Sequence, residues 1–224
     1  MPTTTKTVVY AATRNLYRQV VPCINSVLRN GNVDKIVLLT EDRDYPFDLP
    51  IEITNVSHQP WFNPKGVNFN SRWSYMVMMK VVLSKILYCD KALFLDCDTI
   101  VQKDLSPLWD IDLTDYYFAA VKQKDDGRGG EYFKGDYFNT GVLMCNLKKL
   151  RDGMDDVLIY RLNFHPYQYV EQDCISTECE GKIYPLKGRW NRCPFTEADT
   201  EEYIRHFAAD PNWRNTELGR MYDL

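Results

Sequence analysis

The feature that most constrains the fold of this chain is the stretch of residues 91–101, KALFLDCDTIV, in which two aspartates interrupt an apolar run. The apolar residues 92–95 predict a short strand that is buried on both faces of a sheet. Asp96 and Asp98 follow at its carboxyl end, the edge at which open α/β sheets bind ligands. Side chains two residues apart on a strand face the same side, and two carboxylates there suit Mg²⁺ or Mn²⁺. The same pair also suits a plain strand end that starts a turn.

The remaining elements predict alternating strands and helices, which is typical of a mostly parallel sheet flanked by helices. Strands are expected at Thr7–Ala12, Lys35–Thr40, 51–56, 116–121 and 182–186, and helices at 13–28, 71–87, 105–110, 147–162 and within 169–179. The turn after the first strand contains no glycine-rich loop, which excludes a dinucleotide fingerprint and a P-loop. Because 224 residues with 45% hydrophobic content can form one large core, we expect a single domain over residues 1–224.

The composition excludes several classes of partner. A net charge of −4 with both signs interspersed argues against a nucleic-acid partner and against an anionic membrane surface. No apolar run approaches the roughly 20 residues of a membrane span, and residues 1–15 lack the apolar core of a signal peptide. Seven cysteines, an odd number without CxxC spacing, predict buried thiols in a reducing compartment. We therefore expect a cytoplasmic protein.

Several polar residues interrupt apolar segments and are candidates for a site. Lys80 lies one residue from the centre of the apolar face of the predicted helix 71–87, where it is either a snorkelling surface lysine or a functional one. The glycine-rich stretch 122–136 is either a solvated loop or a mobile flap over a ligand. Gly141, within Asn139-Thr140-Gly141, permits a close backbone approach or a sharp bend. Each of these features leaves a structural and a functional interpretation open.

Five segments, taken in order, resemble glycosyltransferase family 8, the family of glycogenin and of bacterial galactosyl- and glucosyltransferases that build lipopolysaccharide cores. They are LFLDCDTIV at 93–101, YFNTGVLMCNLKKLR at 137–151, EQD at 171–173, RWN at 189–191 and HFAADPNW at 206–213. The resemblance extends from residue 8 to about residue 213. It implies a single GT-A type nucleotide-diphospho-sugar transferase domain with a Rossmann-like, mostly parallel sheet. The nucleotide-binding half would lie at about 1–100, and the half for the donor sugar and acceptor at about 101–224.

The resemblance also implies roles for individual residues. Asp96, Asp98 and His206 would hold a metal ion, either Mn²⁺ or Mg²⁺. Glu171 and Gln172 would be catalytic residues beneath the anomeric carbon. The UDP-sugar donor would be bound by Ala11, Ala12, Thr13, Tyr17, Lys80, Asp96, Cys97, Asp98, Asn139, Thr140 and Asn191, the last of which would also lie near the acceptor. The side chain of Cys97 is expected to point away from the two aspartates, so we do not expect it to bind the metal.

The implied reaction is metal-dependent transfer of a hexose from a UDP-sugar to a hydroxyl of a carbohydrate or other acceptor, with retention at the anomeric carbon. Retention requires either a covalent intermediate on Glu171 or attack on the same face as the departing phosphate. We favour same-face attack, because Gln172 is a poor nucleophile. A self-glycosylating role like that of glycogenin is not implied, and a pyrophosphorylase would carry a glycine-rich loop after the first strand. The sequence predicts no particular oligomeric state.

Departures from the family pattern keep a second class of function open. Lys122 stands where the family carries an aspartate for the donor sugar, and two explanations stay open: either Asp125 or Asp126 replaces that carboxylate, or the donor sugar differs. Ala209 and Asn212 replace the glycine and the Lys-Pro pair of the C-terminal motif. These changes are compatible with a protein that binds a nucleotide sugar but transfers it weakly or not at all.

Overall fold

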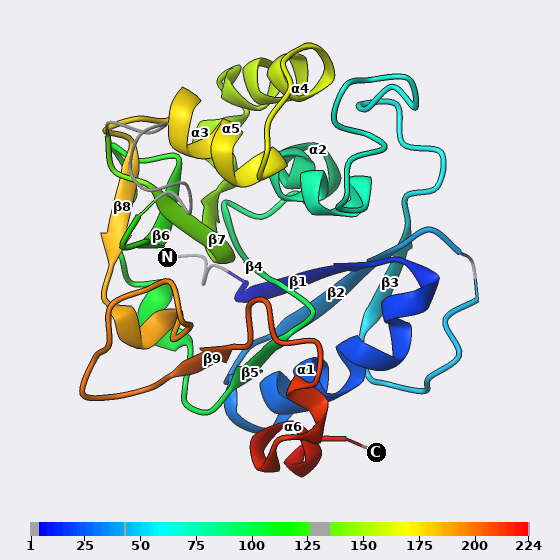
Figure 1. Cartoon of the computed structure of the whole chain (residues 1–224), viewed down its shortest axis with the longest axis vertical. Helices are drawn as coiled ribbons and strands as arrows, with labels where there is room; N and C mark the ends of the chain where they lie inside the picture. Colours follow the sequence, from blue (N-terminus) through cyan, green and yellow to red (C-terminus); the bar gives the residue numbers. More distant parts are fainter. Residues whose placement is uncertain (1–4, 43, 126–134, 224) are drawn as a thin grey trace.

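A mixed seven-stranded sheet forms the centre of the protein, in a computed structural model that describes residues 5–42, 44–125 and 135–223 (Figure 1). The sheet has the order β3-β2-β1-β4-β7-β6-β8. Its strands are β1 (Thr7–Ala12), β2 (Lys35–Thr40), β3 (Glu52–Asn55), β4 (Lys91–Leu95), β6 (Phe118–Lys122), β7 (Phe138–Asn146) and β8 (Ile183–Leu186). Two further strands, β5 (Thr99–Val101) and β9 (Ile204–His206), form a separate antiparallel pair.

Most neighbouring strands of the central sheet are parallel, as the sequence predicts. The pairs β1·β2, β1·β4, β2·β3 and β6·β8 are parallel, whereas β7 is antiparallel to both β4 and β6. The sequence pattern did not assign β7 as a strand, because Asn139-Thr140-Gly141 interrupts its apolar run. All but the last of its nine residues are nevertheless buried, which places these polar groups inside the protein.

Helices cover both faces of the sheet. Figure 1 shows α2, α3, α4 and α5 gathered on one face and α1 with α6 on the other. The helices are α1 (Tyr17–Asn30), α2 (Leu83–Ile86), α3 (Leu147–Leu150), α4 (Met154–Phe164), α5 (Val170–Glu178) and α6 (Glu217–Met221). The 3₁₀ segments are η1 (Arg14–Leu16), η2 (Tyr75–Val82), η3 (Ser106–Leu108), η4 (Gly188–Trp190) and η5 (Trp213–Asn215). The sheet separates two hydrophobic cores, one on each face. Because side chains alternate along β1, Val9 packs in the core with η2, α4 and α5, whereas Val8 and Tyr10 pack in the core with α1.

The helix predicted at 105–110 is the 3₁₀ segment η3, and two longer predicted helices are divided in the structure. The segment predicted as one helix over 71–87 is the 3₁₀ segment η2 followed by the single turn α2, and it begins where the Ser74 hydroxyl accepts a hydrogen bond from Met76 N. The segment predicted as one helix over 147–162 divides into α3 and α4 at Gly153, whose φ of 109° only glycine adopts easily. Within the described ranges, no helix combines the length and the apolar character that a membrane crossing requires.

Candidate active site

Asp96 and Asp98 lie in the turn that joins β4 to β5, at the carboxyl end of β4. Strand β4 ends at Leu95, so the expectation that the two aspartates share one face of a strand is wrong. The turn itself brings them together, and backbone and hydroxyl hydrogen bonds hold it. Asp96 N donates to Gly141 O at 2.9 Å, and the Thr99 hydroxyl donates to Asp96 O at 2.8 Å. The pair is therefore fixed between the central sheet and the small β5·β9 sheet.

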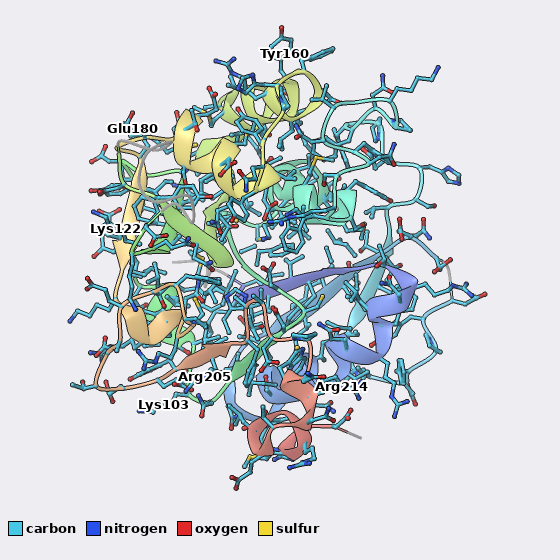
Figure 2. All side chains as sticks on the ribbon, viewed as in Figure 1. Lys103, Lys122, Tyr160, Glu180, Arg205 and Arg214 are labelled. Carbon is cyan, nitrogen blue, oxygen red and sulfur yellow. The ribbon has the colours of Figure 1, made fainter. Side chains whose placement is uncertain are left out.

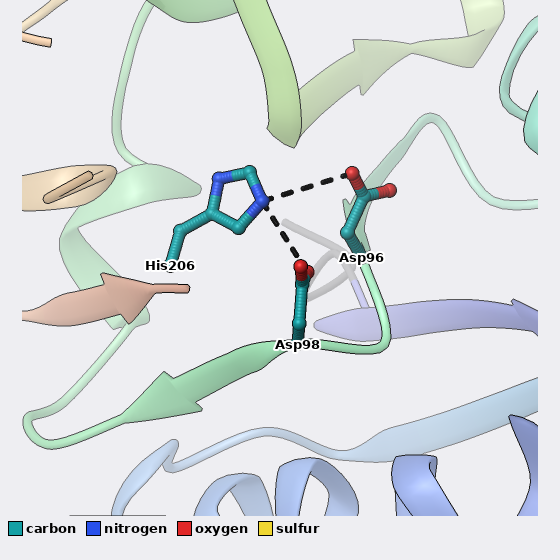
Figure 3. A group of neighbouring side chains, drawn as sticks. All are labelled: Asp96, Asp98 and His206. Carbon is teal, nitrogen blue, oxygen red and sulfur yellow. Dashed lines mark ion pairs between the residues drawn. The ribbon is translucent and has the colours of Figure 1, made fainter. Parts of the chain in front are cut away.

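His206, the last residue of β9, completes the cluster because β9 pairs with β5. The pairing places His206 opposite Thr99, and Figure 3 shows its imidazole directed at both aspartates. His206 Nε2 is 3.3 Å from Asp98 Oδ1 and 3.9 Å from Asp96 Oδ2. One potential ligand atom from each of the three residues lies within 4.8 Å of the others. A Cβ at Gly141 would lie 2.1 Å from His206 Cε1, so the imidazole packs where only glycine leaves room.

The hydrogen bonds of Asn191 determine which nitrogen of His206 faces the aspartates. Asn191 is fully buried, and its Nδ2 donates to Asn139 Oδ1 at 2.8 Å, which leaves its Oδ1 as an acceptor 2.9 Å from His206 Nδ1. His206 therefore carries a proton on Nδ1 and presents Nε2 to the carboxylates. Carbonyl groups that accept a hydrogen bond from the other ring nitrogen orient metal-binding histidines in this manner. Two carboxylates and one imidazole nitrogen with this orientation fit a divalent cation such as Mn²⁺.

Without a cation, the same cluster favours a proton on His206. Burial alone would lower the pKa of His206, but the charge and hydrogen bond of Asp98 outweigh it and raise that pKa to about 10. For Asp98, burial acts to raise the pKa, and the nearby imidazolium reverses this effect and lowers it. Because a metal ion requires the neutral imidazole, cation and proton compete for the same nitrogen.

Lys80, on η2, joins the cluster from the other side of Asp96. Its side chain is 2% exposed, so the interpretation as a snorkelling surface lysine is wrong. Its Nζ lies 2.9 Å from Asp96 Oδ1 and 2.7 Å from Glu171 Oε1. Burial disfavours its charge, but these two carboxylates raise its pKa above the usual value of a lysine. Lys80 thus remains charged inside the protein.

Glu171 and Gln172 reach the site from the first turn of α5. The Thr140 hydroxyl donates to Glu171 Oε1 at 3.2 Å, and Thr140 N donates to Gln172 Oε1 at 3.2 Å. Burial is the main cause that raises the pKa of Glu171, although Lys80 opposes it. Helix α5 begins at Val170, whose φ of 32° is unusual for a β-branched residue. The first turn of α5 is therefore held in an unusual conformation directly beside these two side chains.

The third residue of the EQD segment holds this helix start in place. Asp173 Oδ2 accepts hydrogen bonds from Gln168 N at 3.1 Å and Tyr169 N at 3.0 Å, and its Oδ1 accepts one from the Tyr137 hydroxyl at 2.6 Å. The sequence analysis gave Asp173 no role of its own. Its position within the polar cluster at the start of a predicted helix was the available signal, since aspartate is typical of helix N-termini.

The residues predicted to hold the uracil and ribose lie at the carboxyl end of β1 and at the start of α1. Ala11 and Ala12 end β1 and Thr13 follows them, and the Cys97 thiol donates to Ala11 O at 3.3 Å. The buried Tyr17 donates from its hydroxyl to Asp42 Oδ2 at 3.1 Å, and its ring lies 5.3 Å from that of Tyr45. These residues adjoin the Asp96–Asp98 turn through Cys97. Asp42 was not among the predicted site residues, although it lies just after a predicted strand.

The residues beyond β6 differ from expectation. Lys122 is exposed and pairs with Asp136, and Asp125 is also exposed, while Asp126 lies outside the described residues. Gln123, which the sequence analysis did not single out, is instead buried beside the predicted site residues. Its Oε1 accepts hydrogen bonds from Asn139 Nδ2 and Gln172 Nε2, both at 3.3 Å. A continuous set of hydrogen bonds therefore connects His206 to Gln172 through Asn191, Asn139 and Gln123.

Comparison with known proteins relates this chain to enzymes that transfer sugars. The model of the family described as "Glycosyl transferase family 8" matches residues 7–212. A putative glycosyltransferase of Haemophilus influenzae is 29% identical over 144 residues, which cover 58% of this chain and 42% of that protein. General stress protein A of Bacillus subtilis is 26% identical over 163 residues, which cover 67% and 56%. The chain thus spans about half the length of these curated relatives.

Solved structures share its fold. The crystal structure of the galactosyltransferase LgtC in complex with donor and acceptor sugar analogs has a TM-score of 0.75 at 22% identity, and the match covers 97% of this chain and 96% of that one. The glycosyltransferase GlyE of Streptococcus pneumoniae has a TM-score of 0.70 at 22% identity, with 99% and 60% coverage. At this level of identity the match establishes a common fold and not a common substrate.

Proposed function

The chain belongs to glycosyltransferase family 8, and from this membership we propose that it transfers a hexose from a UDP-sugar to a hydroxyl acceptor, with retention and with a divalent cation. The observation that carries the proposal is the cluster of Asp96, Asp98 and His206, in which Asn191 directs the Nε2 of His206 towards the two carboxylates. We propose that residues 1–224 act as one transferase domain. Its first half, to about residue 100, would bind the nucleotide, and its second half the donor sugar and the acceptor.

The cation proposed for this cluster is Mn²⁺, or else Mg²⁺. When bound there, a divalent cation would offset the negative charge that the departing diphosphate gains as the glycosidic bond breaks. Lys80 contributes to the same electrostatic field from within the protein. Because its Nζ is fixed between Asp96 and Glu171, it orients both carboxylates and cancels part of their charge, so that an anionic diphosphate can approach.

Glu171 and Gln172 would face the anomeric carbon, which becomes positively charged in the transition state. The Oε1 of Glu171 is already engaged by Lys80 Nζ and by the Thr140 hydroxyl. A carboxylate held in this way stabilises positive charge but is a weak nucleophile, which supports same-face attack over a covalent intermediate. Gln172 Oε1 accepts from Thr140 N, so its carboxamide has a fixed orientation. Glu171 and Gln172 would therefore act by holding their oxygen atoms in fixed positions near the anomeric carbon, and not by forming a covalent bond to it.

The uridine moiety would lie at the carboxyl ends of β1 and β2. Ala11, Ala12 and Thr13 would line this region, with Tyr17 held in place by Asp42. Cys97 hydrogen-bonds to Ala11 O and joins the nucleotide region to the metal cluster. Asn139, Thr140 and Asn191 would lie near the donor sugar, with Asn191 also acting on His206.

The test combines binding with turnover. Thermal melting is measured with UDP-glucose and UDP-galactose, each with and without Mn²⁺, for the wild type, Asp98→Asn and the control Asp110→Asn, whose exposed carboxylate lies outside the site. A ligand at 100 times its Kd stabilises the folded state by about 2.7 kcal/mol. We expect manganese-dependent stabilisation in the wild type and in Asp110→Asn, together with release of UDP as the hexose is transferred to an added sugar acceptor or to water, and loss of both in Asp98→Asn.

Two results would contradict the proposal. The absence of any shift with every UDP-sugar, in a protein that melts cooperatively, would mean that the nucleotide-sugar site is wrong. Binding without release of UDP, in the presence of a range of sugar acceptors, would instead favour the alternative of a nucleotide-sugar-binding protein without transferase activity.

A further inference from the structure

Gln123 is a buried carboxamide at the end of β6 that the expected set of site residues does not include. The residue is 7% exposed. Its backbone is fixed from two directions, because Gln123 N donates to Tyr137 O at 2.7 Å and the residue forms an isolated bridge with Thr196. The pairing of β6 with β7 shifts register between Ala119 and Val121, and beyond this irregularity Lys122 is exposed whereas Gln123 is buried. Figure 2 shows Lys122 at the periphery of the molecule.

Two backbone amides determine how the Gln123 carboxamide is oriented. Gly141 N donates to Asn139 Oδ1, so Asn139 must present its Nδ2 to Gln123. Thr140 N donates to Gln172 Oε1, so Gln172 must present its Nε2 to Gln123. Both neighbours are therefore donors, and the atom of Gln123 that faces them is the acceptor Oε1. The Nε2 of Gln123 consequently points away from both.

This Nε2 has no partner within the described part of the chain, since both hydrogen bonds of the Gln123 side chain involve Oε1. Among the described residues, fully enclosed side-chain atoms without a partner occur only at Tyr10, Tyr45, Trp109 and Arg214. Because Gln123 Nε2 is not one of these atoms, it retains contact with solvent. A buried amide whose acceptor is used twice, and whose two N–H groups have no partner among the described residues, can donate a hydrogen bond to an oxygen atom of a ligand.

We infer that Gln123 is a specificity-determining residue, whose Nε2 donates a hydrogen bond to a hydroxyl oxygen of the donor sugar. The inference rests on the proposed function, because it places the sugar beside Asn139 and Gln172. It also gives Gln123 the contact with the donor sugar that the sequence analysis considered for Asp125 or Asp126.

The surrounding charges define the class of sugar. The side chains that hydrogen-bond to the side chain of Gln123 are the neutral carboxamides of Asn139 and Gln172. Lys80 is engaged by Asp96 and Glu171, and Lys122 pairs with Asp136. A hexuronic acid would bring a carboxylate to a subsite where both of these lysines are already paired and where Glu171 is close to Gln172. The donor is therefore a neutral hexose.

The experiment measures the affinity for UDP and for UDP-hexoses separately, by calorimetry with Mn²⁺ at pH 8. Gln123→Glu keeps an acceptor oxygen for Asn139 and Gln172 but removes the N–H donor. We expect its affinity for UDP to remain within twofold of the wild type, while its affinity for the preferred one of UDP-glucose and UDP-galactose falls about tenfold or more. The matched control is Lys122→Gln, in the adjacent exposed residue, which should change neither affinity.

Single-deoxy analogues of the preferred donor identify the hydroxyl group concerned. In the wild type, the loss of one hydroxyl should weaken binding about tenfold, and in Gln123→Glu the same loss should make no further difference, as a double-mutant cycle requires for a direct contact. If Gln123→Glu does not fold, Gln123→Met replaces it, with the same expected loss of discrimination. UDP-glucuronic acid should bind the wild type more weakly than both neutral donors.

Several outcomes would overturn the inference. If Gln123→Glu binds UDP-hexoses like the wild type while Gln123→Met does not, Gln123 only positions Gln172 and makes no contact with the sugar. Tighter binding of UDP-glucuronic acid than of the neutral donors would overturn the neutral class of sugar. If the wild type binds UDP but no UDP-sugar, the sugar subsite is wrong. If it binds neither, the proposed function fails together with the inference.

Discussion

Asp96 separates two clusters of charge that are built in opposite ways. On one side, Asp96 Oδ1 and Glu171 enclose Lys80, so that the protein itself supplies the cation. On the other side, Asp96 Oδ2 and Asp98 face His206, whose imidazole is neutral unless it takes up a proton. The first cluster is complete within the chain. The second has an excess of negative charge that a proton or a metal ion must balance.

The difference shows how one carboxylate can serve a fixed and an exchangeable site at once. Lys80 and Glu171 are almost fully buried, whereas Asp96 and Asp98 retain 32% and 24% exposure of their side chains. The enclosed ion pair fixes Asp96 by one oxygen, and its other oxygen remains available on the accessible side. The buried Lys80–Glu171 pair thus orients Asp96 without occupying the accessible side, where a ligand of Asp96 would bind.

Removal of the fixed cation should have the largest effect. Lys80→Met leaves Asp96 and Glu171 as uncompensated carboxylates, and the loss of one partner from a buried pair costs about 3–5 kcal/mol. We expect the free energy of unfolding, measured by urea denaturation, to fall by this amount. The matched control is Lys103→Met, because the pair Lys103–Glu201 is exposed and should contribute less than about 1 kcal/mol.

A second variant tests whether the loss has an electrostatic origin. In Lys80→Met combined with Glu171→Gln, one of the two carboxylates is neutral, and part of the lost stability should return. Equal stability of Lys80→Met and Lys103→Met would break the comparison, because the Lys80 cluster would then contribute no more than a surface pair.

An intermediate effect is expected when the hydrogen bond between Asn191 and His206 is removed from the proposed metal-binding cluster. Asn191→Leu keeps a similar shape but removes the acceptor that holds the Nδ1 proton of His206. Loss of such a partner typically lowers metal affinity about 10–100-fold. Mn²⁺ affinity, measured by electron paramagnetic resonance, should fall in this range in Asn191→Leu and remain unchanged in Asn215→Leu, whose side chain lies outside the site. Undiminished Mn²⁺ binding in Asn191→Leu would show that His206 is oriented without Asn191.

The buried strands were predictable because continuous apolar runs record burial directly. β1, β2 and β4 lie where the sequence places them. Hydrophobic periodicity also identified the buried face of residues 71–87, but it does not distinguish 3₁₀ from α-helical hydrogen bonding, and η2 was therefore missed. β7 was not predicted as a strand because its buried polar residues, Asn139 and Thr140, interrupt the apolar run and face the candidate site. Local patterns thus predict the scaffold better than the residues that line the site.

The candidate site divides in the same manner. Asp96, Asp98 and His206 were found through motifs, and the structure brings them together. The resemblance pointed to Lys80, but its burial between two carboxylates depends on the packing of η2 against β4 and α5. Gln123 was not predicted because its hydrogen-bond partners, Asn139 and Gln172, lie on other segments. Asp173 lies at the start of a predicted helix, but its bond to Tyr137 also joins it to another segment. No local sequence signal reports contacts of this kind.

The smallest effect we expect is a pH dependence that only the exchangeable cluster shows. In the metal-free protein the pKa of His206 is about 10, against about 6.5 for an unfolded histidine, so between these values the folded state binds the extra proton. Stability is then fully present below about pH 6.5 and is lost as the pH rises towards 10, by at most about 1.4 kcal/mol per pH unit. Urea denaturation in a metal chelator at pH 7 and pH 8 should show this decrease in the wild type and in His165→Gln, but not in His206→Gln. Saturating Mn²⁺ should abolish it, because the metal-bound imidazole carries no proton on Nε2 in the folded state. A decrease that persists in His206→Gln would place the titrating group elsewhere, and the two clusters would then not differ in the way that the geometry indicates.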